Sequence, residues 1–201
     1  EGLTWTVRHA YHGSEFYRER FDAAGVKPDD IQSLDDLRRL PFVTAQDLQA
    51  GYPFPLRAVP FEDIVRIHAS SGTTGKRKVM AYTAKDIDDW ANMFARCYEL
   101  AGLTALDRVQ ICVGYGVWTA GVGFQNGCER FGAMALPVGP GNTEMHLQFL
   151  EDFQPTVICA TASMALLLAE EAEKAGISDR LSVRKVIMGA ERSSDAMRAK
   201  I

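Results

Sequence analysis

The stretch that decides the fold runs from residue 64 to residue 83 and reads IVRIHASSGTTGKRKVMAYT. Two short apolar runs, Ile64–Ala69 and Val79–Thr83, are rich in β-branched and aromatic residues, which predicts a strand on either side of a loop. Glycines let a backbone approach a ligand closely, and hydroxyls and amides donate hydrogen bonds to phosphate oxygens. The loop therefore predicts a polyphosphate site, with an ordinary Ser- and Gly-rich turn as the alternative. The candidate phosphate-binding residues are Ser70, Ser71, Gly72, Thr73, Thr74, Gly75 and Lys76.

This loop differs from the Walker A loop of P-loop ATPases. A Walker A loop has four residues between its glycines and a Ser or Thr after its Lys. Here two residues separate Gly72 from Gly75, and Arg77 follows Lys76. The predicted strand-to-strand placement also differs from the strand-to-helix turn of those ATPases. The sequence thus indicates a phosphate loop of another kind.

From residue 61 to residue 201 the pattern predicts alternating strands and helices. Strands that are apolar on both faces and joined by helices indicate a mostly parallel sheet covered on both sides, so the fold class is α/β. A helix that begins after Thr83 carries Trp90, Phe94 and Tyr98 on one face, which predicts that these rings pack in the core. The further strands are expected at about 109–113, 133–138, 156–160 and 184–188, with helices at about 120–131, 143–153, 163–175 and 194–201.

Residues 1–60 predict a separate N-terminal helical segment. Tyr11 to Ala24 has the pattern of one helix closed by Gly25, and two later segments begin with a hydroxyl followed three residues on by an acid, at Ser33 and Thr44. His9 and His12 lie three apart, but a stable metal site usually needs three or four ligands. We therefore assign no metal site and no chemistry to this segment.

Composition limits the classes of function. The chain has 201 residues, a hydrophobic fraction of 47% and a formal net charge of -4, which is typical of a globular protein and argues against nucleic acid as a partner. No apolar run is long enough to span a bilayer. The four cysteines form no CxxC pair, which favours isolated core thiols in a cytoplasmic protein. They are Cys97, Cys112, Cys128 and Cys159.

The loop and several later segments resemble a known family. The run Ser70–Lys76 is similar to the phosphate-loop signature of adenylate-forming enzymes. The segment Gly114–Gly121, reading GYGVWTAG, resembles the corresponding segment of phenylacetate–CoA ligases. The further segments that resemble this family are Phe16–Phe21, Glu129–Ala133, Asp152–Val157 and Gly189–Glu191. The resemblance covers nearly the whole chain and implies an incomplete N-terminal domain of such an enzyme, whose C-terminal lid domain is expected to be missing.

The resemblance implies an activity. Enzymes of this family ligate an acid, here an aryl acid such as phenylacetate, to coenzyme A through an acyl-adenylate, with ATP as substrate and Mg²⁺ beside it. The loop Ser70–Lys76 would hold the β- and γ-phosphates. The resemblance also implies adenine-binding residues, Gly189, Ala190 and Glu191, and aryl-pocket residues, Tyr115, Gly116 and Trp118. Each has a structural alternative: Trp118 as core packing, and Glu191 as a capping acid before Ser193 and Ser194.

Other interpretations stay open at this point. Relatives of the family adenylate other acceptors, such as a deazaflavin cofactor or an acid of a polysaccharide pathway. A non-catalytic nucleotide-binding module that pairs with a separate C-terminal chain is a third interpretation. We further expect that the 201 residues alone do not complete adenylation, and the family resemblance also makes a homodimer an expectation.

Overall fold

The computed structural model describes residues 1–72 and 75–201, and it divides into two compact units. The first unit is Glu1–Asp86 and the second is Ile87–Ile201. The sequence predicts a domain boundary near residue 60. The structure places the boundary later, because the first unit also contains the two strands that follow residue 60. The reason is that those two strands hydrogen-bond to each other and form a sheet of their own. The predicted division at residue 60 stays a prediction.

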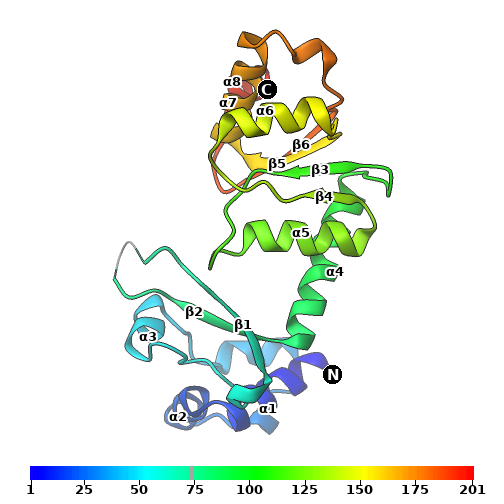
Figure 1. The fold of residues 1–201 in the computed structure, drawn as a ribbon. Coiled ribbons are helices and arrows are strands. Elements are labelled where there is room, and N and C mark those ends of the chain that lie inside the picture. The colour runs from blue at the N-terminus through cyan, green and yellow to red at the C-terminus, as the bar shows by residue number, and fades with distance from the viewer. Residues whose placement is uncertain (73–74) are drawn as a thin grey trace. The chain divides into compact units, whose positions relative to one another are not determined.

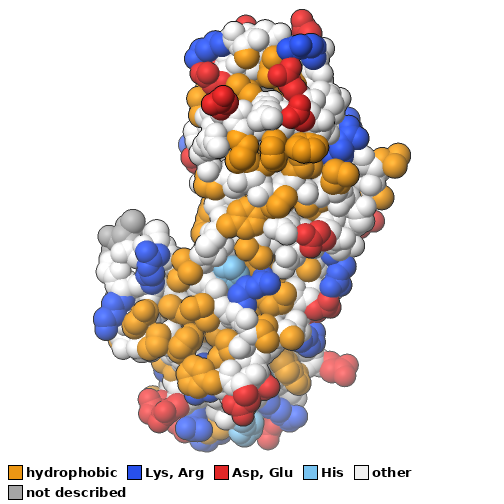
Figure 2. Space-filling view, viewed as in Figure 1, with side chains coloured by type: hydrophobic (Ala, Val, Ile, Leu, Met, Phe, Trp, Pro, Cys, Tyr) orange, Lys and Arg blue, Asp and Glu red, His pale blue; other side chains and the backbone are white. Residues whose placement is uncertain are grey.

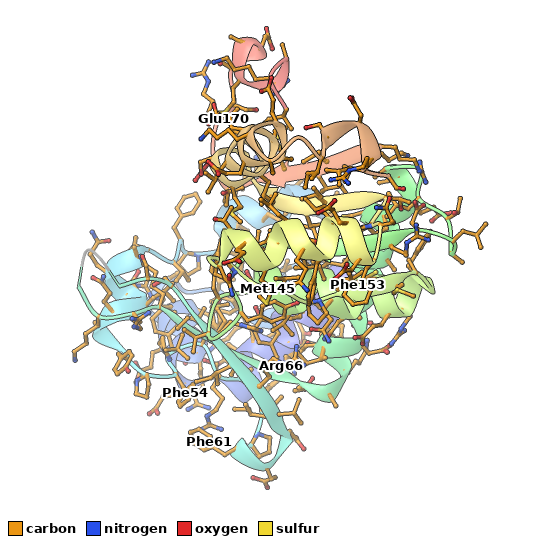
Figure 3. The ribbon with its side chains drawn as sticks, turned by 45° about the horizontal axis from the view of Figure 1, so that its top comes forward. Phe54, Phe61, Arg66, Met145, Phe153 and Glu170 are labelled. Carbon is orange, nitrogen blue, oxygen red and sulfur yellow. The ribbon has the colours of Figure 1, made fainter. Side chains whose placement is uncertain are left out.

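Helices of the first unit pack around a small apolar core. The core contains Val7, Phe21, Val26 and Ile31, all buried. Phe54 and Phe61 stack edge to face at 5.4 Å between ring centroids and lie close together in Figure 3. The elements are α1 (Gly2–Gly13), α2 (Glu15–Ala23), two short 3-10 turns at Pro28–Asp30 and Leu34–Arg39, α3 (Ala45–Ala50) and a 3-10 turn at Phe61–Asp63.

The prediction of a single helix from Tyr11 to Ala24 is wrong. The structure breaks it into α1 and α2 at Ser14, whose backbone is extended and whose side chain is buried. The capping prediction at Thr44 is confirmed, because its hydroxyl and Asp47 form a reciprocal box at the start of α3. The box at Ser33 and Asp36 begins a 3-10 turn.

The predicted strand–loop–strand unit is a hairpin. Strands β1 (Ile64–Ala69) and β2 (Val79–Thr83) pair antiparallel, with Ala69 opposite Val79 at the loop end (Figure 1). Helix α4 (Ala84–Leu100) follows at once, and its start is fixed by hydrogen bonds between Thr83 and Asp86. The hairpin therefore places the loop between two paired strand ends, as the sequence predicts.

The second unit is built on a four-stranded parallel sheet with strand order β4-β3-β5-β6. The chain runs from β3 outward to β4, crosses to β5 on the other side of β3, and continues to β6. This change of direction creates a topological switch point between β3 and β5, where open α/β sheets bind ligands at the carboxyl ends of their strands. The bounds are β3 (Arg108–Ile111), β4 (Met134–Leu136), β5 (Val157–Thr161) and β6 (Lys185–Gly189).

Helices cover both faces of this sheet, as predicted (Figure 1). On one face Tyr98 of α4 and Cys128 of α5 pack against the sheet residues Ile111 and Val157. On the other face Leu150 of α6 and Leu168 of α7 meet the opposite side of β5. Figure 3 places Met145 and Phe153 at the two ends of α6. The helices are α5 (Ala120–Phe131), α6 (Thr143–Asp152), α7 (Ala162–Lys174) and a short α8 (Asp195–Arg198).

The cysteine prediction is right for three residues and wrong for one. Cys112, Cys128 and Cys159 are buried free thiols, and burial raises the pKa of each to about 12. Cys97 is exposed, because it lies on the face of α4 that turns away from the buried side chain of Tyr98. Among the described residues, no helix combines the length and apolar character needed to cross a bilayer.

Candidate nucleotide site

The loop of the hairpin is closed at its base by Ser70. Its N–H donates to the carbonyl of Lys78 at 3.0 Å, and its hydroxyl accepts from the Lys78 N–H at 3.0 Å. The guanidinium of Arg77 donates to the Ser70 carbonyl at 2.9 Å. Ser70 thus fixes the width of the loop, and part of its hydrogen-bonding capacity is used within the loop.

Both described glycines of the loop adopt backbone conformations that L side chains rarely take. Gly72 has φ +75° and Gly75 has φ +127°. A Cβ at Gly72 would lie 2.8 Å from Cγ of Arg77, so glycine is required there on steric grounds as well. The predicted phosphate-binding residues Thr73 and Thr74 lie outside the described residues.

Helix α3 and the residues after it support the exit of the loop. The side-chain amide of Gln49 donates to the Lys76 carbonyl at 3.4 Å, and the ammonium of Lys76 lies 5.6 Å from the ring centre of Tyr52. Ser71, Lys76 and Arg77 are exposed, and Figure 2 shows Lys and Arg side chains (blue) at this end of the hairpin. The described part of the loop therefore combines a fixed backbone with exposed positive charge, which suits a polyanion.

The segment Gly189–Glu191 leaves the carboxyl end of β6. Gly189 still pairs with Thr161 of β5, and Ala190 then adopts a left-handed conformation with φ +67°. The carboxylate of Glu191 accepts two hydrogen bonds from Ser163, one from the backbone N–H and one from the hydroxyl, both at 2.9 Å. These hydrogen bonds hold the pKa of Glu191 below its usual value. Glu191 is therefore a capping acid, as the structural alternative proposes, but it caps α7 and not the helix after Ser194.

The segment that resembles the aryl pocket follows β3 at the same edge of the sheet. The Tyr115 ring packs against Gly121, where an added Cβ would lie 2.8 Å from it. Its hydroxyl is buried and has no hydrogen-bond partner among the described residues, and burial raises the pKa of Tyr115 to about 12. Gly116 (φ +63°) and Trp118 are exposed, with Trp118 at 41%. Trp118 is thus not core packing, whereas Tyr115 faces the interior.

A buried polar cluster fixes the neighbouring loop after β4. His146 is fully buried, and its Nε2 lies 2.9 Å from the Gly139 carbonyl, while its Nδ1 lies 2.9 Å from the side-chain amide of Gln110. Burial lowers the pKa of His146, which favours the neutral ring. The cluster holds Gly139 beside Tyr115, since a Cβ on Gly139 would contact the Tyr115 ring at 3.8 Å.

The structure thus brings together, in the second unit, the segments after β3, β5 and β6 at one edge of the sheet. The sequence patterns did not single out Thr161, the last residue of β5 and N-cap of α7, or Ser163, the second residue of α7. Their position was a usable signal, because both lie where an apolar strand ends, and parallel strands place their carboxyl ends at the edge where ligands bind.

Comparison with known proteins decides the family. The family model described as "AMP-binding enzyme" matches residues 11–200. The chain belongs to the AMP-binding enzyme family. Phenylacetate-coenzyme A ligase of Escherichia coli (strain K12) is 48% identical over 201 residues, which is 99% of this chain and 46% of that protein. The ligase of the same name from Aromatoleum evansii is 47% identical and is again covered to 46%. The resemblance drawn from the sequence is confirmed.

Solved structures of the AMP-binding family agree with the fold. A 2-hydroxyisobutyryl-CoA ligase in complex with 2-HIB-AMP and CoA matches with a TM-score of 0.88 and 27% identity, over 98% of this chain and 45% of that one. The predicted fold class, an N-terminal portion of an adenylate-forming enzyme, is confirmed. The chain spans under half the length of the curated relatives it matches.

Proposed function

We propose that the chain is part of an AMP-forming acid–CoA ligase that joins an aryl acid such as phenylacetate to coenzyme A through an acyl-adenylate. Relatives at 41–48% identity that carry the name phenylacetate-coenzyme A ligase support the acid and the thiol. The solved ligase in complex with 2-HIB-AMP and CoA supports the adenylate route for the family. ATP, the aryl acid and coenzyme A are the proposed small-molecule partners.

The single observation that carries the proposal is the loop of the hairpin, whose backbone conformation depends on glycine. Its two described glycines have positive φ, its base is closed by Ser70, and Lys76 and Arg77 are exposed beside it. We assign this loop to the β- and γ-phosphates of ATP. When the acid's carboxylate attacks the α-phosphorus, the bond to the bridging oxygen breaks and pyrophosphate leaves with the negative charge that these groups stabilise.

Mg²⁺ belongs to the proposal as the ion that accompanies ATP. The described loop residues offer a hydroxyl at Ser71 and cations at Lys76 and Arg77, and no carboxylate. The ion would therefore be held mainly by phosphate oxygens and water, which is the usual way Mg²⁺ binds with nucleotides. Coenzyme A supplies the thiolate that displaces AMP in the second step.

The segments of the second unit receive the organic groups in this proposal. We assign Gly189, Ala190 and Glu191 to the adenine, with the backbone as the contact because the Glu191 carboxylate is engaged by Ser163. We assign Gly116 and Trp118 to the aryl ring, since both are exposed at the carboxyl edge of the sheet. Tyr115 would support this pocket from the interior.

A comparison of ATP with AMP tests the phosphate assignment. We expect Lys76→Ala to weaken ATP binding by the chain about 10- to 100-fold, because a hydrogen bond to a charged group contributes ~1.5–3 kcal/mol. AMP lacks the β- and γ-phosphates, so its affinity should change less than about twofold. Isothermal titration calorimetry measures both. Lys174→Ala removes the same charge from an exposed helix position and serves as the control.

Equal weakening of ATP and AMP by Lys76→Ala would show that the loop does not hold the distal phosphates. For the acid, a chimera that completes the chain with the remaining part of the Escherichia coli relative allows acid-dependent pyrophosphate exchange to be measured. Phenylacetate should support faster exchange than 2-hydroxyisobutyrate. The reverse order would contradict an aryl pocket at Trp118.

A further inference from the structure

We propose that Ser163 is a positioning residue for the nucleotide: it clamps Glu191 and thereby fixes the backbone of Gly189–Glu191 against which adenine binds. This inference rests on the proposed function, because it deepens the adenine assignment. Ser163 is the second residue of α7 and lies directly after the switch-point strand β5. It would act through Glu191, without touching the ligand itself.

The first support is that two anchors flank a strained residue. On one side of Ala190, Gly189 is held by sheet pairing opposite Thr161. On the other side, Glu191 is held by both hydrogen-bond donors of Ser163 at 2.9 Å. A left-handed conformation is unfavourable for a non-glycine residue, so it persists only where the surroundings impose it. In this proposal the clamp and the sheet pairing together hold Ala190 at its φ of +67°.

The second support is electrostatic. The first N–H groups of a helix lack partners within the helix and carry partial positive charge. Thr161 accepts from the Met164 N–H at 3.3 Å, and the Glu191 carboxylate accepts from the Ser163 N–H. Glu191, like an ordinary glutamate, is charged at neutral pH, and the hydrogen bonds from Ser163, first the backbone one, lower its pKa further. At neutral pH the two hydrogen bonds from Ser163 are therefore made to a charged carboxylate, which strengthens them.

The third support is position. The junction of β5 and α7 at Thr161–Ser163 lies beside the exit of β6 at the carboxyl edge of the sheet. Ligands of open α/β sheets bind at that edge near the switch point. A clamp there restricts a backbone segment next to a proposed ligand, and restricting it before binding saves the entropy that ordering would cost.

Three variants of the full 201-residue chain test the clamp. Ser163→Ala removes the hydroxyl donor and should weaken ATP and AMP equally, by about tenfold, because both ligands carry adenine. Ser163→Thr retains a hydroxyl and should bind both within about twofold of the original chain. Ser194→Ala removes another capping hydroxyl, at the start of α8, which has no bond to Glu191, and should leave both affinities unchanged. Calorimetry gives the affinities, and thermal unfolding by circular dichroism shows that each variant is folded.

The outcomes separate this inference from the proposed function. If the original chain binds neither ATP nor AMP, the proposed function is wrong and the clamp has nothing to position. If the chain binds both and Ser163→Ala binds as tightly, the proposed function stands and the clamp is refuted. If Ser163→Ala weakens ATP alone, Ser163 acts on the phosphates, which also refutes the clamp. Should Ser163→Ala not fold, Glu191→Gln tests the same bonds from the other side and should weaken both ligands equally.

Discussion

Gly13, the last residue of α1, lies so close to the backbone of Ala58 that a side chain there has no room. A Cβ at Gly13 would be 2.1 Å from the Ala58 carbonyl oxygen, whereas a Cβ at Gly2, in the same helix, would meet nothing within 4 Å. Gly72 and Ala190 both have positive φ. Glycine adopts this conformation without strain, whereas at Ala190 the neighbouring residues must hold it. At this scale the presence or absence of one methyl group decides the local structure.

We expect Gly13→Ala to destabilise the chain by about 1–3 kcal/mol, because overpacking forces the backbone apart. Gly2→Ala is the matched control and should leave stability unchanged or raise it slightly, since alanine is the better helix former. Urea unfolding followed by circular dichroism measures both. A Gly13→Ala variant as stable as Gly2→Ala would mean that the approach of Ala58 is not close in solution.

At the scale of elements, the amino edge of the second unit's sheet carries a hydrogen-bonded cluster, and the proposed binding segments lie at the carboxyl edge. The amino ends of three strands are joined through Asp107, whose carboxylate accepts hydrogen bonds from Thr104, Thr156 and Arg184. Burial alone would raise the pKa of Asp107, but these hydrogen bonds outweigh it and hold the pKa below its usual value. The proposed binding segments lie at the opposite, carboxyl edge.

Asp107→Asn should therefore lower stability by roughly 2 kcal/mol at neutral pH without changing ATP affinity. Because the folded pKa lies below the unfolded value of about 3.9, the stabilisation is complete above that value and is lost as pH falls through the folded pKa. The stability difference between the original chain and the variant should thus shrink as the pH is lowered from about 5 through the folded pKa of Asp107. Urea unfolding across that range measures it, with the exposed Asp152→Asn as control. An unchanged difference at low pH would exclude Asp107 as the group that titrates.

At the scale of the whole molecule, each unit has its own apolar core. We expect a fragment of residues 83–201 to fold with the parallel sheet intact, because both core clusters of the second unit lie within it. A fragment of residues 87–201 lacks the Thr83–Asp86 box and should be less stable by about 1 kcal/mol. Thermal unfolding compares the two fragments. An unfolded fragment of residues 83–201 would show that its core needs the first unit.

Sequence alone predicts much of this fold where local signals suffice. The helix at Ala120–Phe131 is found with its closing Gly132 at φ +91°, and Gly102 and Gly176 likewise end helices in left-handed conformations. The break at Ser14 follows Gly13, which approaches Ala58 closely, and no local pattern shows such a contact between residues far apart in sequence. The bond between Ser163 and Glu191 was hidden for the same reason. Local sequence patterns identified the candidate segments. The hydrogen-bond partners of their side chains depend on contacts between residues far apart in sequence, which the local patterns do not show.

The distribution of the four cysteines has a practical consequence. Three thiols are sealed in the interior and resist ionisation at neutral pH, while Cys97 on α4 is open to solvent. Thiolates, not thiols, react with maleimides and similar reagents. The native sequence thus carries one natural attachment point for a fluorophore or spin label, and a spectroscopic probe can be placed on α4 without any engineered residue.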